Sequence, residues 1–130
     1  MKWLTSKNKK RHQREMNKMV RKANKAIEED SLWCGRFVIR QVNSPQWNVY
    51  YDKSGAEYFV HLEITDRCTG RKWIGADTVN RWRGPSGSCY HLYEFINWFI
   101  VNYCNIWEEP FAKARDFNAW REYNRTCRKV

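Results

Sequence analysis

The first regular pattern in the chain is a stripe of apolar residues at helical spacing. Between residues 16 and 27, apolar side chains recur at intervals of three, four and seven positions, at Met16, Met19, Val20, Ala23, Ala26 and Ile27. This spacing places them on one face of an α-helix, and Ser6 is a suitable N-cap for it. The same face is polar before residue 16. We therefore expect a docked helix over residues 16–28, preceded by residues 1–15 as a more loosely held basic arm.

The period changes from helical to two-residue alternation after Gly35. Short β-branched and aromatic runs, separated by turn-forming residues, occupy residues 36–42, 47–51, 58–65 and 71–76. Runs of this kind predict an antiparallel β-meander of three to four strands. Within it, the alternation directs four polar side chains to one outer face: Arg40, Tyr50, His61 and Lys72.

Two helices are predicted after the sheet. Residues 92–107 are apolar nearly all round, which is typical of a helix central to a core. Pro110 stops this segment and suits the start of a last helix, whose apolar positions include Phe111, Ala114, Phe117 and Trp120. The whole pattern predicts one α+β domain over residues 1–130, with an N-terminal amphipathic basic helix, the β-meander, and two C-terminal helices packed on one sheet face.

The charge is concentrated at the N-terminus. Residues 1–27 hold ten of the 24 basic residues and one of the 14 acidic residues, a net charge of +9, whereas residues 28–130 carry +1. A solvated helix face normally mixes signs, and here only Glu15 interrupts the positive charge. Cations recur at steps of three or four positions on the side away from the apolar stripe, at Lys7, Arg11, Arg14, Lys18, Arg21 or Lys22, and Lys25. Such a ridge suits nucleic-acid phosphates or an acidic protein surface.

A second candidate for anion contact is the loop before the first C-terminal helix. Arg81 and Arg83 flank a stackable Trp82, and Gly and Pro residues follow them. Two arginines beside a helix N-terminus fit a phosphate or an unpaired base. The phosphate-binding pattern G-x-x-x-x-G-K-[ST] is absent. The alternative is a plain connector in which Ser88 caps the following helix.

No complete catalytic or metal-binding motif is present. His61 and Glu63 form half of a zinc-deaminase signature, but the P-C-x-x-C half is missing. Cys89 and His91 form one close-spaced pair, where structural zinc usually needs two, so whether they join another cysteine in binding zinc stays open. We therefore expect a protein that is not an enzyme, with no cofactor, no resident metal and no small-molecule substrate.

The cysteines and the hydropathy bear on location. Five cysteines, an odd number without C-x-x-C spacing, predict free thiols in a reducing cytoplasm. No apolar stretch is long enough to cross a bilayer and the N-terminus lacks an apolar signal segment, so no membrane partner is expected.

Eight Trp, seven Tyr and six Phe are many for 130 residues and can build either a core or an adhesive surface.

The order of elements resembles that of the double-stranded RNA-binding domain, although the basic cluster which that family places at the start of its last helix is absent from residues 88–93. In texture the chain also resembles small accessory proteins of bacterial viruses, a group that includes inhibitors of host defence enzymes. The leading hypothesis is a non-enzymatic module that contacts DNA or RNA phosphates through its basic helix. The alternative is a virus-type inhibitor that docks on a host protein, such as a nucleic-acid-targeting nuclease.

Overall fold

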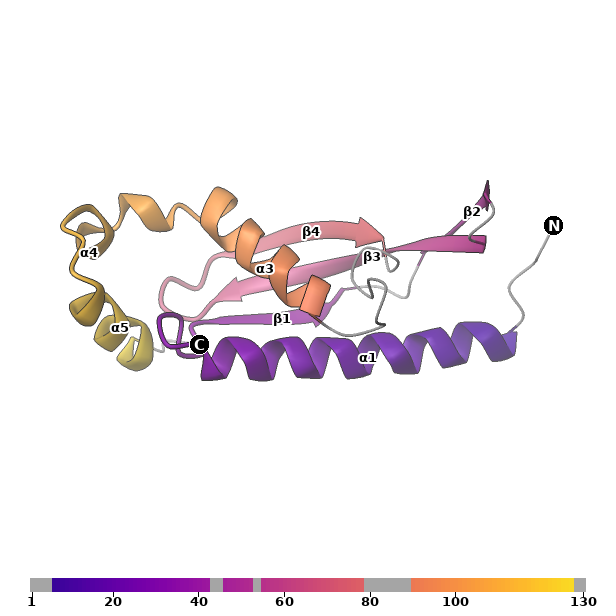
Figure 1. The fold of residues 1–130 in the computed structure, drawn as a ribbon, viewed down its shortest axis with the longest axis horizontal. Coiled ribbons are helices and arrows are strands. Elements are labelled where there is room, and N and C mark those ends of the chain that lie inside the picture. Colours follow the sequence, from indigo (N-terminus) through magenta and orange to yellow (C-terminus); the bar gives the residue numbers. More distant parts are fainter. Residues whose placement is uncertain (1–5, 43–45, 53–54, 79–89, 128–130) are drawn as a thin grey trace.

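The computed structural model describes residues 6–42, 46–52, 55–78 and 90–127, together with the side chains of Arg14 and of residues 16–42, 61–75 and 92–127. A helix comes first, an antiparallel sheet follows, and helices end the chain (Figure 1). The elements are α1 (Ser6–Glu29), β1 (Phe37–Gln41), β2 (Gln46–Asp52), β3 (Gly55–Asp66), β4 (Lys72–Thr78), α3 (Tyr90–Tyr103), the 3-10 turn η1 (Ile106–Glu108), α4 (Pro110–Lys113) and α5 (Phe117–Thr126). The predicted mixed fold with a leading helix is confirmed.

The long strand β3 is the centre of the sheet. Its residues 62–66 pair with β1 and its residues 55–59 pair with β2, while residues 59–65 pair with β4. Phe59 lies between β2 and β4, and residues 62–65 lie between β1 and β4. Strands β1 and β2 are therefore successive segments along one edge of β3, and β4 lies along the other edge. The sheet is therefore three strands wide. The expected meander is wrong at its first step, since β1 pairs with β3 and not with β2.

Helices α1 and α3 cover one face of this sheet. That face presents Ile39, Leu62 and Ile64, all buried, to an equally buried set of helix residues: Met16, Ala23 and Ile27 of α1 and Leu92, Ile96 and Ile100 of α3. Gly75 of β4 lets α3 approach closely, because a Cβ there would lie 3.3 Å from the Phe99 ring. The opposite face carries polar side chains and the exposed Ile74.

The last predicted helix is broken in two. Arg115 adopts a left-handed conformation (φ 54°) between α4 and α5, and the Asp116 carboxylate accepts a hydrogen bond from the Ala119 N–H, which caps α5. Helix α5 then lies at the end of the sheet (Figure 1). It packs against the segment between α1 and β1, where Asn124 donates to the Leu32 carbonyl and Trp120 meets Trp33 edge-on.

A buried guanidinium joins this C-terminal part to the sheet. All five N–H donors of Arg36 are used: Nε and Nη2 bond the two Asp66 carboxylate oxygens, Nη1 and Nη2 bond both Glu109 oxygens, and Nη1 also bonds Asn124 Oδ1, at 2.7–3.0 Å. Arg36, Asp66 and Asn124 are each at most 1% exposed. Nothing in the sequence pattern predicted this cluster.

The ion pairs set the protonation states of the cluster. Burial alone would lower the pKa of Arg36, but the hydrogen bonds and charges of Asp66 and Glu109 raise it further above its ordinary value. Burial would likewise raise the pKa of Asp66, yet the hydrogen bonds and charge of Arg36 lower it. The guanidinium and the Asp66 carboxylate are thus both ionised inside the protein.

The prediction of five free thiols is wrong for two of them. Cys68 and Cys127 form a disulfide with a Cα–Cα distance of 5.0 Å, within the usual range. They are 59 residues apart in sequence, and the fold brings the β3–β4 turn beside the end of α5. Cys104 is a buried free thiol, and the Cys34 thiol donates to the Ser31 carbonyl. Since disulfides are rare in the cytosol, the thiol argument for a cytoplasmic location no longer holds.

Arg36 and Arg40 offer a matched test of the buried cluster, because each pairs with a carboxylate but Arg40 lies at the surface. We expect Arg36→Ala to lower the free energy of unfolding by about 3–5 kcal/mol, because the buried Asp66 and the partly buried Glu109 are left without their cation. Arg40→Ala should cost much less. Urea unfolding of both variants measures this, and equal losses would show that burial of the cluster contributes nothing special.

The depressed pKa of Asp66 predicts an acid-dependent loss of stability. A carboxylate with a lowered folded-state pKa stabilises the fold above its unfolded pKa, at about pH 4, and loses that contribution as the pH falls further. Asp66→Asn should therefore be less stable than the native protein at pH 7, with a difference that shrinks below about pH 4. Urea midpoints across this range measure the effect. A difference that does not change with pH would contradict it.

The disulfide predicts sensitivity to reductant. Closing a loop of this length stabilises a protein by about 4 kcal/mol in the chain-entropy treatment. Dithiothreitol should lower the thermal midpoint of the native protein and leave the Cys68→Ser/Cys127→Ser variant unchanged. If reductant has no effect on the native protein, and both thiols react with an alkylating agent without prior reduction, the pair is not bonded in solution.

Candidate nucleic-acid interface

The orientation of α1 on the sheet decides which of its side chains meet solvent. Four positions of its apolar stripe are buried, at Met16, Met19, Ala23 and Ile27. A polar contact fixes the helix further: the Asn24 amide donates to the Ile39 carbonyl and accepts from the Ile39 N–H, both at 2.9 Å. Asn24 thus satisfies backbone groups on the free edge of β1, where a further strand would otherwise bond.

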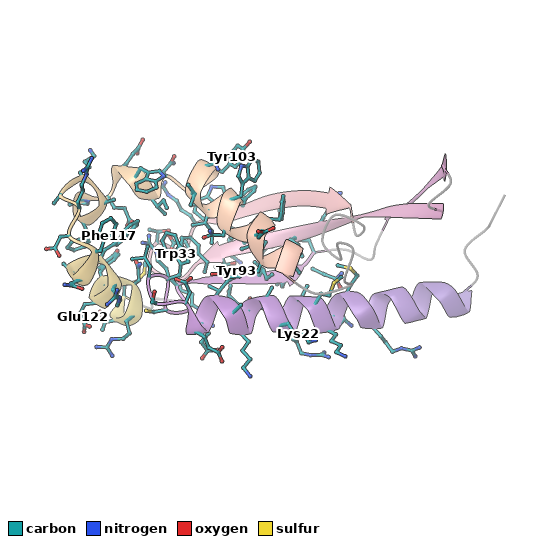
Figure 2. The ribbon with its side chains drawn as sticks, in the orientation of Figure 1. Lys22, Trp33, Tyr93, Tyr103, Phe117 and Glu122 are labelled. Atoms are coloured by element: carbon teal, nitrogen blue, oxygen red, sulfur yellow. A yellow bond between two sulfur atoms is a disulfide. The ribbon has the colours of Figure 1, made fainter. Side chains whose placement is uncertain are left out.

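The cations of α1 lie on the side away from this contact. Figure 2 shows Lys22 projecting from α1 away from the sheet. Five of the seven predicted cations have described side chains, and all five are exposed: Arg14, Lys18, Arg21, Lys22 and Lys25. Lys7 and Arg11 belong to the same helix, but their side chains are outside the described residues. From Lys7 to Lys25 the helix rises about 27 Å, at 1.5 Å per residue.

The sign of the surface changes at the end of α1. Lys25 Nζ lies 3.9 Å from Glu29 Oε1, and both side chains are well exposed. Glu28 is exposed as well. A surface pair of this kind contributes little energy, but its carboxylate offsets the charge of Lys25. The strongest positive stretch among the described residues is therefore Arg14 to Lys22.

A hollow of about 380 Å³ extends the basic face from α1 toward the sheet. Its lining includes Arg21 from the helix and Arg40 from β1. Arg40 bonds both carboxylate oxygens of Glu63, at 2.8 and 3.1 Å, and Lys72 Nζ lies 3.7 Å from the same carboxylate. The hydrogen bond from Arg40 holds the pKa of Glu63 below its ordinary value. Two cations thus share one carboxylate, which leaves one net positive charge beside Arg21.

Arg40 was predicted from the sequence only as part of a polar outer face, and its place beside Arg21 was not. Alternation predicts which face of the sheet a strand residue lies on, but it does not predict which helix packs along the edge of that strand. Among the other members of that predicted face, Lys72 shares Glu63 with Arg40, and Tyr50 has no described side chain.

The remaining candidates lie outside the described residues. Arg81 and Arg83 fall in residues 79–89, as does Cys89, and the side chain of His91 is not described. The predicted phosphate-binding loop and the single close-spaced cysteine–histidine pair therefore stay predictions. Over the part of the chain that the structure describes, no group of three His, Cys, Asp or Glu side chains could hold a metal ion.

Among the described residues, no helix is both long and apolar enough to cross a membrane. No protein-family model matches the chain, and no characterised protein or solved structure shows significant similarity to it.

Proposed function

We propose that the protein binds the phosphates of a nucleic acid through the exposed cationic face of α1. The observation that supports this most is the division of α1 into a buried apolar stripe and an exposed row of cations. Four of these form no ion pair with a carboxylate among the described side chains: Arg14, Lys18, Arg21 and Lys22. Because the helix backbone is already docked, only the cationic side chains have to be ordered when they contact phosphates.

The same geometry favours the phosphate backbone over the bases. The row consists of long cationic side chains spread along one helix, and cations of this kind contact phosphates along a backbone. Binding of this kind depends on the release of counterions and is independent of sequence. The proposed module is therefore a non-enzymatic protein that holds DNA or RNA by its backbone, with Arg40 as an added contact beside Arg21.

Position, in addition to total charge, should determine this affinity. We expect the variant Arg14→Gln/Lys18→Gln/Arg21→Gln/Lys22→Gln to bind a labelled duplex more weakly, whatever its sequence. The slope of log affinity against log salt should flatten by about 3 to 4 units if each cation neutralises one phosphate, since each contributes about −0.9. Fluorescence anisotropy at several salt concentrations measures the slope.

The control variant removes the same charge from other surfaces. Arg71, Lys113, Arg115 and Arg121 are all exposed and none lies on α1, so replacing these four with Gln should leave the slope nearly unchanged. Equal effects of the two variants would mean that only the net charge matters. If the native protein binds neither DNA nor RNA at low salt, the proposal is wrong. Loss of a protein partner from a nuclease-treated lysate by the helix variant alone would then favour docking on an acidic protein.

A further inference from the structure

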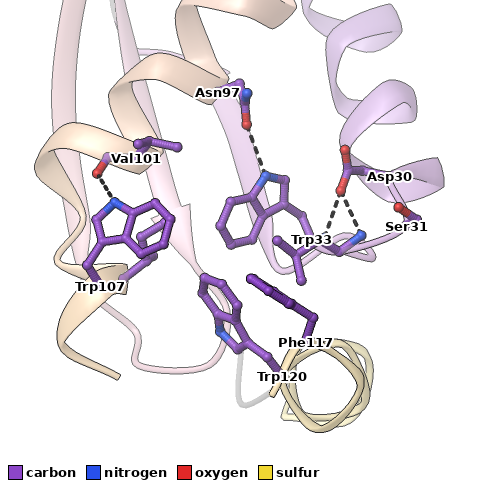
Figure 3. Close-up of a pocket in the computed structure, with 10 residues that line it drawn as sticks. Asp30, Ser31, Trp33, Asn97, Val101, Trp107, Phe117 and Trp120 are labelled. Atoms are coloured by element: carbon purple, nitrogen blue, oxygen red, sulfur yellow. Dashed lines mark hydrogen bonds between the residues drawn. The ribbon is translucent and has the colours of Figure 1, made fainter. Parts of the chain in front are cut away.

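A pocket of about 320 Å³ lies at the opposite end of the molecule from the N-terminus of α1. It is enclosed by the turn after α1, by α3 and η1, and by α5 (Figure 3). Four aromatic side chains form much of its lining: Trp33, Trp107, Phe117 and Trp120. This volume is at the lower end of the range of ligand sites, about 300–1,000 Å³, and suits a small ligand.

The aromatic residues divide into an inner and an outer pair. Trp33 and Trp120 are buried and meet edge-on, with ring centroids 5.4 Å apart. Trp107 and Phe117 are about half exposed, and each lies 6.3 Å from the Trp120 ring. Trp120 is therefore the centre of the aromatic group, and the two outer rings flank it where the pocket meets solvent.

The indole nitrogens of these walls are already engaged. Trp33 Nε1 donates to Asn97 Oδ1 and Trp107 Nε1 donates to the Val101 carbonyl, each at 3.1 Å. Trp120 Nε1 donates to Glu109 Oε1 at 3.2 Å. The same bonds use the Asn97 side-chain oxygen and the Val101 carbonyl as acceptors. The walls consequently offer a ligand the half-exposed rings of Trp107 and Phe117, with the nearly buried Trp33 and Trp120 beside them. Ser31 is a further polar residue of the lining.

Among the described residues of the lining, the one charged side chain is a carboxylate. Asp30 Oδ1 accepts from the N–H groups of Leu32 and Trp33 at 2.9 Å, and Oδ2 accepts from the Tyr93 hydroxyl at 2.7 Å. Burial and this bond raise the pKa of Tyr93 to about 12, so its hydroxyl remains a donor. No described cation forms an ion pair with Asp30. On a chain of net charge +10, the described residues that line this pocket include no Lys, Arg or His.

We propose that this pocket binds an organic cation without N–H donors, that is, a quaternary ammonium group. Aromatic rings attract cations through their quadrupoles, most strongly when water is excluded, and Trp is the best of them. The Asp30 carboxylate adds attraction for positive charge and repels anions. A primary ammonium needs hydrogen-bond acceptors to replace water, and those of the lining are largely occupied. A quaternary ammonium needs none.

Choline and its neutral carbon isostere, 3,3-dimethylbutan-1-ol, test the proposal on the native protein. Each is titrated at constant ionic strength while the indole N–H signals are followed by NMR. We expect choline to shift the signals of Trp33, Trp107 and Trp120 and to bind at least tenfold more tightly than the alcohol, a difference of about 1.4 kcal/mol. Equal affinities would show a merely apolar pocket, and no shift with choline would overturn the site.

Two variants and a matched control locate the binding. Trp107→Leu and Asp30→Asn should each weaken choline binding, and Asp30→Asn should leave binding of the neutral alcohol unchanged. Trp98 of α3 is the control, because it is as exposed as Trp107 (51% and 55%) but does not line the pocket. Trp98→Leu should bind choline as the native protein does. If Trp98→Leu and Trp107→Leu weaken binding equally, the cation binds elsewhere.

Discussion

The arrangement of the C-terminal third of the chain depends on the Arg36 guanidinium. This side chain bonds Asp66 at the end of β3, Glu109 before α4 and Asn124 in α5, which are 30, 73 and 88 residues away. A buried ion pair gains little net stability, because the desolvation of the charges offsets their attraction. Its geometry is demanding, however, since five donors must meet acceptors in one plane. Few other placements of α5 would satisfy them.

The same cluster supports the aromatic pocket. Glu109 accepts from Arg36 and also from Trp120 Nε1, so the carboxylate that neutralises the guanidinium also orients the central ring of the pocket. The disulfide links the same cluster to the end of α5. Cys68 lies two residues after Asp66 and donates its N–H to the Asp66 carboxylate, and its partner Cys127 directly follows α5. Ion cluster, disulfide and pocket therefore form one junction at the end of the sheet.

The sequence predicted the features that depend on local periodicity. The stripe from Met16 to Ile27 and the alternation in β1 can be recognised in the sequence. Each needs only an apolar surface to pack against, whichever residues form that surface. The burial of Arg36 could not be predicted in this way, because an arginine is buried only where distant carboxylates meet it. The break at Arg115 lacks the Gly or Pro that would mark it. The sequence shows that aromatic residues are many. Which of them lie in the core, on the surface or in the pocket depends on the path of the chain between Trp33 and Trp120.

The charge change at the end of α1 separates two surfaces of opposite chemistry. Cations dominate from Arg14 to Lys22, Lys25 pairs with Glu29, and Asp30 lies in the pocket lining one residue later. At physiological salt, exposed charges are screened beyond about 8 Å, so each surface acts on its own surroundings. A phosphate chain along α1 would be repelled at Glu28, Glu29 and Asp30, and a cation in the pocket would be little affected by the basic row. The two proposed sites are therefore electrostatically compatible in one small domain.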